Sequence, residues 1–199
     1  DNRGLFGKQL QVWKEESGDI SKLDKYMPVG YGRPINENDN SWESSDTLQG
    51  GFWEGGKHWS EVLADDAINL IDDSKKIDDP FFMYLAFNAP HDPRQAPERF
   101  LEMYPIDQIK LPPNYSPQHP YWKEIGNEPG VRDEGLAPYP RSEFAVKKHI
   151  QEYYAVISHL DEQVGKIVSH LESQKMLDNT YIIFTSDHGL AVGQHGLIG

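Results

Sequence analysis

The chain has 199 residues, 37% of them hydrophobic, which is enough material for one sizeable apolar core. Its 32 acidic and 19 basic residues leave a formal charge of −13. This charge argues against nucleic acid or an anionic membrane as a partner, because phosphate recognition needs a basic surface. No apolar run approaches the roughly 18 residues of a membrane span, and the lack of cysteine excludes disulfides and thiol catalysis.

The first part of the chain differs in pattern from the rest. Residues 1–58 are rich in polar and turn-forming residues, so we expect long surface loops there. Residues 59–76, WSEVLADDAINLIDDSKK, place apolar side chains at a helical spacing, from Trp59 through Ala67 to Ile71. An amphipathic helix is therefore predicted, and we divide the chain into segments 1–58 and 59–199.

A continuous apolar run follows at residues 81–87, FFMYLAF, bounded by prolines. Its length is typical of a buried strand in a parallel sheet that is covered on both faces. Residues 92–140 hold most of the fourteen prolines, which indicates an extended, loop-rich insertion. One short helix is predicted within it, in APERFLEMY at 96–104.

A long helix is predicted from Ser142 onward. Its apolar residues fall on one stripe, formed by Ile150, Tyr154, Ile157, Val164, Val168 and Leu171. Asp161 lies in the same stripe, and we interpret it as a locally hydrogen-bonded or partly exposed acid. After a turn at 178–180, YIIFT at 181–185 predicts a second buried strand. This order of elements is typical of an α/β fold.

Polar residues follow both predicted strands. The first strand runs into NAPH at 88–91, and the second runs into SDHG at 186–189. Ligands bind at the carboxyl ends of parallel strands, so neighbouring strands would bring His91, Asp187 and His188 to one rim. An acid and an imidazole on a glycine-rich turn can bind a divalent cation. The same residue types also serve ordinary turns, so the pattern alone leaves both interpretations open.

Two further interpretations concern the end of the chain. A catalytic triad at Ser186, Asp187 and His188 is rejected, because consecutive residues cannot present three side chains in relay geometry. His195, in GQHG, is either a substrate contact or simply a loop residue. We keep it as a candidate for substrate binding.

Three segments resemble the central part of type I sulfatases, the formylglycine-dependent enzymes of the alkaline phosphatase superfamily. They are PFFMYLAFNAPHDP at 80–93, EYYAVISHLDEQVGKIV at 152–168 and NTYIIFTSDHGLAVGQHGLIG at 179–199. Their order and spacing are collinear with the family over residues 59–199. The resemblance implies an α/β fold with a mixed, mostly parallel sheet flanked by helices. Residues 59–199 would then form the central part of the catalytic domain, and 1–58 a loop-rich segment of it.

The resemblance also implies roles for single residues. Asp187 would be a ligand of Ca²⁺, and His188 would border the metal, although nitrogen is an unusual donor to a hard cation. His91 would contact the sulfate and assist protonation of the leaving oxygen, as an ester of this kind requires. The implied reaction is hydrolysis of a small-molecule or glycan sulfate ester. The family also implies a periplasmic or secreted location.

Members of this family carry three features that the sequence lacks. These are an N-terminal Asp-Asp pair, a Cys- or Ser-x-Pro-x-Arg motif whose first residue becomes the formylglycine nucleophile, and a lysine after the glycine-rich turn. We therefore expect the chain to be an internal fragment of a sulfatase and to be inactive by itself.

Two alternatives remain open at this stage. Phosphodiesterases and phosphonate hydrolases of the same superfamily share the scaffold and the metal rim. A non-catalytic carbohydrate-binding module could use tryptophans as stacking platforms, namely Trp42, Trp53, Trp59 and Trp122.

Overall fold

A computed structural model describes most of the chain from residue 56 onward and little before it. The described residues are 15, 34, 36–40, 42–47, 51–52, 56–92, 94–126 and 134–199. Their helices, in chain order, are α3 (Trp59–Ser74), α4 (Glu98–Leu101), η2 (Glu134–Leu136), α5 (Glu143–Ser173) and η3 (Leu177–Asn179). Most of the predicted loop segment 1–58 lies outside the described residues, so that division stays a prediction.

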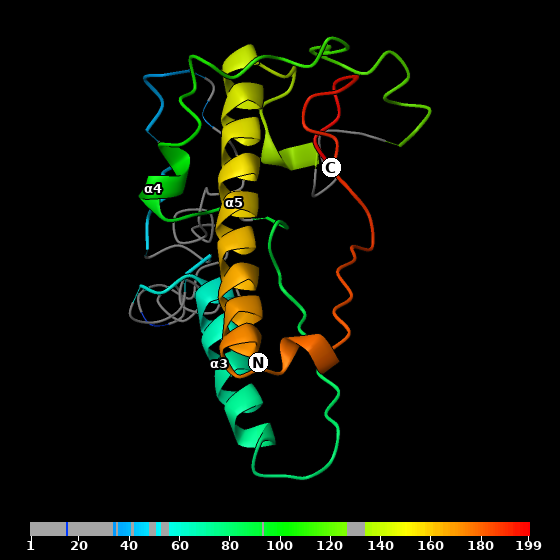
Figure 1. Cartoon of the computed structure of the whole chain (residues 1–199). Helices are drawn as coiled ribbons and strands as arrows, with labels where there is room; N and C mark the ends of the chain where they lie inside the picture. The colour runs from blue at the N-terminus through cyan, green and yellow to red at the C-terminus, as the bar shows by residue number, and fades with distance from the viewer. Residues whose placement is uncertain are drawn as a thin grey trace.

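Helix α3 confirms the predicted helix at 59–76. His58 caps it with an extended backbone, and its Nδ1 accepts a hydrogen bond from the backbone N–H of Ser60 at 3.1 Å. The buried face is narrow and made mainly of small residues: Ser60, Ala64, Ala67 and Ile71. Small side chains allow α3 to lie close against α5, and Figure 1 shows the two helices side by side.

Helix α5 begins where the sequence predicts. The Oγ atom of Ser142 caps it by accepting a hydrogen bond from the N–H of Ala145 at 3.1 Å. Asp161 is exposed, in agreement with the interpretation of this acid. The predicted apolar stripe is wrong in part, because Tyr154 and Ile157 are exposed. The buried face instead includes five polar residues, namely His149, Gln151, Glu152, His159 and Gln163.

Three apolar clusters pack along α5. Its first turns contribute Val146 and Ile150 to a cluster with residues of the C-terminal turn. Its middle packs against α4, and its last turns bury Ile167 and Leu171 against α3. The predicted short helix in 96–104 is α4, which supplies Phe100 to the middle cluster. No helix among the described residues has the length and apolar character needed to cross a membrane.

The two predicted strands are not formed. Within the described residues the only β-pairings are two isolated bridges, Phe52 with His58 and Tyr115 with Gln194. A strand needs a neighbour to pair its N–H and C=O groups, and residues 81–87 and 181–185 have none here. The prediction of a sheet is therefore not confirmed in these segments.

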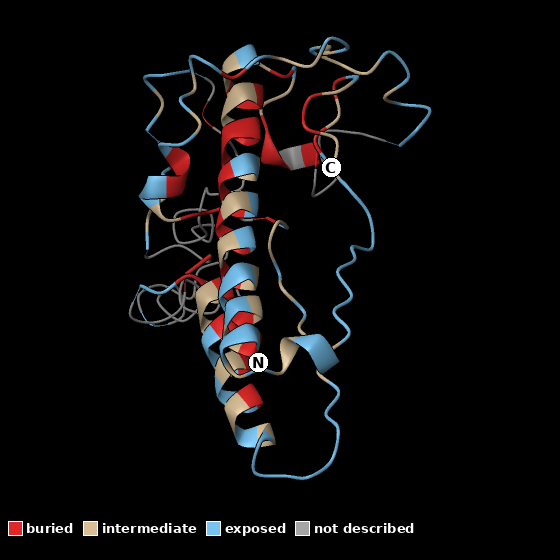
Figure 2. Cartoon of the chain, in the orientation of Figure 1, coloured by how far each residue is buried: buried red, intermediate tan, exposed pale blue. Residues whose placement is uncertain are grey.

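The first segment still shows the period of a strand. Met83, Leu85 and Phe87 pack on the cluster between α3 and α5, whereas the alternate residues face away and Phe82 is 92% exposed. One face is thus covered, not both as predicted. The second segment, from Tyr181 onward, is exposed along its whole length, as the pale blue trace in Figure 2 shows.

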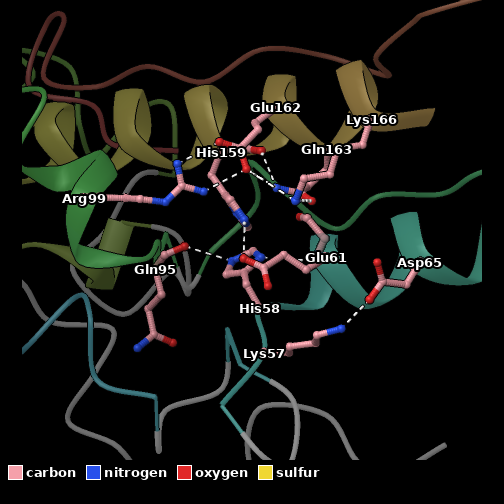
Figure 3. A network of polar contacts seen from close by, with 11 residues as sticks. Lys57, His58, Glu61, Asp65, Gln95, Arg99, His159, Glu162, Gln163 and Lys166 are labelled. Atoms are coloured by element: carbon pink, nitrogen blue, oxygen red, sulfur yellow. Dashed lines mark hydrogen bonds and ion pairs between the residues drawn. The ribbon is translucent and has the colours of Figure 1, made fainter. Parts of the chain in front are cut away.

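A buried pair of histidines lies where α3, α4 and α5 meet (Figure 3). The rings of His58 and His159 are perpendicular, with centroids 4.4 Å apart. The Nε2 of His58 lies 3.0 Å from the carbonyl oxygen of Gln95, and the Nε2 of His159 lies 3.1 Å from a carboxylate oxygen of Glu61. Each Nε2 therefore carries the proton. The Nδ1 of His159 has no hydrogen-bond partner among the described residues.

Charged residues surround this pair. Arg99 forms two hydrogen bonds of 2.7 Å with the carboxylate of Glu162, and these hold the pKa of Glu162 at about 2. Lys166 lies 3.4 Å from the same carboxylate. Burial lowers the pKa of both histidines from 6.5 to about 4, because a charged imidazole would lose its hydration there. Both are therefore neutral at pH 7.

Acidification should destabilise the fold through these two histidines. In the unfolded chain the two imidazoles bind protons below about pH 6.5. In the folded protein they bind protons only near pH 4. Their contribution to stability is complete above the unfolded pKa and is lost as the pH falls toward the folded value. Each should lower the free energy of unfolding by about 1.4 kcal/mol per pH unit in this window. Urea unfolding at a series of pH values measures the slope.

Two variants test the origin of this slope. His159→Gln should make it shallower, whereas His188→Gln, at an exposed histidine, should leave it unchanged. An equal slope in the wild type and in the His159 variant would contradict the assignment.

Candidate functional site

His91 lies in the turn that follows the first extended segment. Its side chain is half exposed, and its Nδ1 lies 3.0 Å from both the carboxylate and the backbone oxygen of Asp92. Asp92 is buried, and the turn is closed by a hydrogen bond from the N–H of His91 to the carbonyl of Asn88 at 2.9 Å. Oxygen acceptors at Nδ1 place the ring proton there and leave Nε2 available for proton exchange.

Asp187 and His188 lie in the exposed turn after the second segment. The backbone N–H of His188 donates to the Asp187 carboxylate at 3.0 Å, and this hydrogen bond is the main reason that the pKa of Asp187 is lowered. The two side chains are 3.7 Å apart, and that of Asp187 is 88% exposed. Asp187 therefore presents an ionised carboxylate to its surroundings.

The Ser186 hydroxyl donates to the carbonyl of His188 at 2.7 Å, not to its imidazole. Its Oγ lies 3.5 Å from a carboxylate oxygen of Asp187, and the Nδ1 of His188 lies 2.9 Å from the carbonyl of Gly189. These contacts are local to the turn. They provide no serine–histidine hydrogen bond, as expected from the rejection of a triad.

The described residues do not bring all the predicted site residues together. In Figure 1, residues 81–91 and 181–188 run in the same direction past α5. No described contact joins His91 to Asp187 or His188, and no cluster of three or more acids and histidines is present in the described part of the chain. The predicted rim thus exists as two separate turns.

A calcium ion fits this site only in part. The carboxylate of Asp187 is a hard oxygen donor, ionised and accessible, and it suits Ca²⁺. The imidazole of His188 is a poorer donor for such a cation. Calcium takes about 6–8 oxygen ligands, so most of them would come from residues outside the described part.

His195 lies at the exposed tip of the C-terminal turn. Its backbone has a φ of 56°, in the left-handed region. Its Nε2 lies 2.8 Å from the side-chain nitrogen of Asn114, and its backbone N–H donates to the carbonyl of Asn114 at 2.9 Å. Asn114 is 81 positions away in the sequence, and no sequence pattern links it to His195.

A buried ion pair holds this turn from the other side. The guanidinium of Arg141 donates to the carboxylate of Glu134, and its Nε donates to the carbonyl of Gly196 at 3.2 Å. The second carboxylate oxygen of Glu134 accepts from the N–H groups of Ile198 and Gly199 at 3.2 and 3.3 Å. We call Glu134 and Arg141 the clamp. Two charged residues in a proline-rich loop offered no sequence signal for it.

The three described tryptophans do not form a stacking surface. Trp42 is buried, and its indole N–H donates to the carboxylate of Glu152 at 2.7 Å. Trp59 and Trp122 are half buried, and Trp53 lies outside the described residues. The placement of Trp42 argues against the carbohydrate-binding module.

Comparison with known proteins identifies the family. The sulfatase family model matches residues 2–199, so the chain belongs to the sulfatase family. Iduronate 2-sulfatase of Mus musculus is 35% identical over 145 residues, which cover 66% of this chain and 26% of that protein. The uncharacterized sulfatase YidJ of Escherichia coli is 27% identical over 166 residues, which cover 80% of this chain and 31% of that protein.

A crystal structure of a protein named as a sulfatase, yidJ from Bacteroides fragilis, is similar in fold. The TM-score is 0.54 at 27% identity, over 76% of this chain and 29% of the other. This likeness supports the alkaline-phosphatase-like α/β fold of sulfatases. The chain thus spans less than a third of the length of these three relatives.

Loss of the clamp should destabilise the C-terminal turn. Glu134→Ala leaves the buried guanidinium without its carboxylate, so we expect a loss of about 3 kcal/mol in the free energy of unfolding. The amides of Ile198 and Gly199 should also exchange with solvent faster. Urea unfolding and hydrogen exchange measure both effects.

Glu162→Ala is the matched control, because it removes an exposed partner of Arg99 and should lower stability by less than about 1 kcal/mol. Equal losses in the two variants would show that the clamp does not stabilise the fold as a buried pair.

Proposed function

We propose that this chain forms part of the active site of a sulfatase, which hydrolyses a sulfate ester to an alcohol and sulfate. Membership of the sulfatase family supports the reaction. The observation that carries the proposal is the contact of His91 with the buried Asp92, directly after an extended segment. A histidine held in this way is suited to proton transfer.

In this mechanism His91 acts as the general acid. Asp92 accepts at Nδ1 and so holds the ring in one orientation, with Nε2 directed away from this contact. The protonated ring donates from Nε2 to the departing alkoxide, which would otherwise leave as a strong base. Neutral His91 can then recover a proton from water.

Asp187 is the proposed calcium ligand of this chain, and His188 borders the metal. When bound, the cation would neutralise the charge on the sulfate oxygens. The formylglycine nucleophile would come from residues outside these 199, since the sequence has no cysteine and no Ser-x-Pro-x-Arg motif. The chain alone is then inactive. The coverage of less than a third of the relatives supports this division.

We also propose that residues 81–87 and 181–185 are strands of a mixed, mostly parallel sheet. The alternating burial of the first segment and the common direction of both segments in Figure 1 support this. Their ends would then bring His91 and Asp187 to one edge. The substrate is proposed to be a small-molecule or glycan sulfate ester, and the location periplasmic or secreted.

One experiment separates this function from its phosphate-directed alternative. The full-length protein and the 199-residue chain are assayed on nitrophenyl sulfate and nitrophenyl phosphate, with and without EDTA. We expect EDTA-sensitive release of sulfate by the full-length protein and no turnover by the chain. Preference for phosphate would move the protein to the phosphodiesterase branch, and turnover by the chain would refute its proposed inactivity.

The role of His91 has its own test in the full-length enzyme. His91→Gln should lower kcat by about 10²–10⁴-fold, because the general acid is lost. Asp92→Asn should lower it by about tenfold or more, since the ring loses the carboxylate that orients it through Nδ1. His119→Gln is the control and should retain activity, because among the described residues this side chain contacts Tyr121, whose N–H donates to its Nδ1. Unchanged kcat in His91→Gln would exclude the proposed role.

A further inference from the structure

The turn at residues 192–198 is held by buried residues at both ends and by an internal hydrogen bond, and its tip is exposed. Val192 and Ile198, at its two ends, are buried in the cluster formed with the first turns of α5. Within the turn, the N–H of Gly193 donates to the carbonyl of Leu197 at 2.8 Å. The exposed residue at the tip is His195. The turn therefore holds the exposed imidazole of His195 on a well-packed base.

Glycine is required for the close approach of this turn to its neighbour. Gly196 has a φ of +79°, and a Cβ there would lie 2.7 Å from the backbone nitrogen of His119. The turn is therefore packed closely against residues 116–119, which begin two positions after Asn114. The clamp adds a hydrogen bond to the carbonyl of the same glycine.

His195 itself has an unfavourable backbone conformation. A φ of 56° places its backbone in the left-handed region, which non-glycine residues adopt at some cost in free energy. Histidine offers no stability advantage over glycine there, and the ring is exposed. Strain of this kind, maintained by surrounding structure, is typical of functional positions.

Asn114 holds both the backbone and the ring of this histidine. Its carbonyl accepts from the N–H of His195 at 2.9 Å, and its side-chain nitrogen lies 2.8 Å from Nε2. An amide NH₂ group can only donate, so Nε2 is the acceptor and the ring proton is on Nδ1. Free histidine favours the opposite tautomer. The described residues provide no partner for Nδ1, which leaves this N–H free to donate to a ligand.

We propose that Asn114 is a positioning residue that fixes the Nδ1–H tautomer and the orientation of His195, so that this N–H donates to an anionic oxygen of the substrate. The identity of that anion, the sulfate group, rests on the proposed function. The tautomer and the orientation do not, because they follow from the two contacts with Asn114.

The tautomer is measured first, by ¹⁵N NMR of the full 199-residue chain with labelled histidine. The wild type should show His195 with its proton on Nδ1. Asn114→Ala should return the ring toward the Nε2–H tautomer. Asn114→Asp should enforce Nε2–H, because a carboxylate can only accept. Asn179→Ala, at an exposed asparagine away from the turn, is the control and should leave the tautomer unchanged.

An Nε2–H tautomer in the wild type would overturn the proposal, because the amide of Asn114 would then be the acceptor. The same holds if Asn114→Ala leaves the proton on Nδ1. Neither result bears on whether the protein is a sulfatase, so the two proposals fail separately.

The substrate contact is measured in the full-length enzyme, which does not require the isolated chain to fold. Asn114→Asp and His195→Ala should each raise KM for nitrophenyl sulfate about tenfold, the effect of one lost hydrogen bond to a charged group. Both should leave kcat nearly unchanged, in contrast to His91→Gln. Unchanged KM in both variants would exclude His195 as a substrate contact. Absence of sulfatase activity in the wild type would overturn that contact together with the proposed function, while the tautomer result would still stand.

Discussion

The packing along α5 determines where the other described segments lie. Its 31 residues extend about 46 Å, and each of the three apolar clusters contains residues of this helix. One end packs against the turn that carries His195, and the other end packs against α3 and the segment that leads to His91. His91 and His195 are therefore positioned relative to one rigid element, although they are distant from one another in the sequence.

The buried polar residues of α5 make this packing specific. His149 contacts the carbonyl of Leu136 through Nε2 at 3.1 Å, and Glu152 accepts from the indole of Trp42 at 2.7 Å. Leucine at these positions would bury more apolar surface, but it would make no hydrogen bond that fixes the neighbouring loops at one position along the helix. A buried polar group has few satisfactory partners, so each one selects a single register of loop and helix.

What the sequence could predict depends on how local the cause is. The start of α5 follows from Ser142 and the periodicity after it, and both causes lie within a few residues. His91 is predictable because it lies in the turn that follows an apolar run. Asn114 and the clamp were missed, because their contacts join residues that are remote in the chain and carry no common pattern. The predicted strands stay unconfirmed for the same reason, since a strand depends on its neighbours and the described residues supply none to either segment.

The unpaired segments also explain why the candidate site is divided. Each segment ends in a turn that carries candidate site residues, and hydrogen bonds within each turn already order it. The ends of the two segments come to a common edge only when backbone hydrogen bonds join them as strands, either directly or through an intervening strand. Phe82 and Tyr181 are 92% and 100% exposed, and they belong to the apolar surface that a closed, packed sheet would bury. Assembly of the metal rim and burial of this apolar surface would, on the proposed function, be one event. On the proposed function, catalysis requires the closed sheet, because without it His91 and Asp187 cannot act on the same sulfate group.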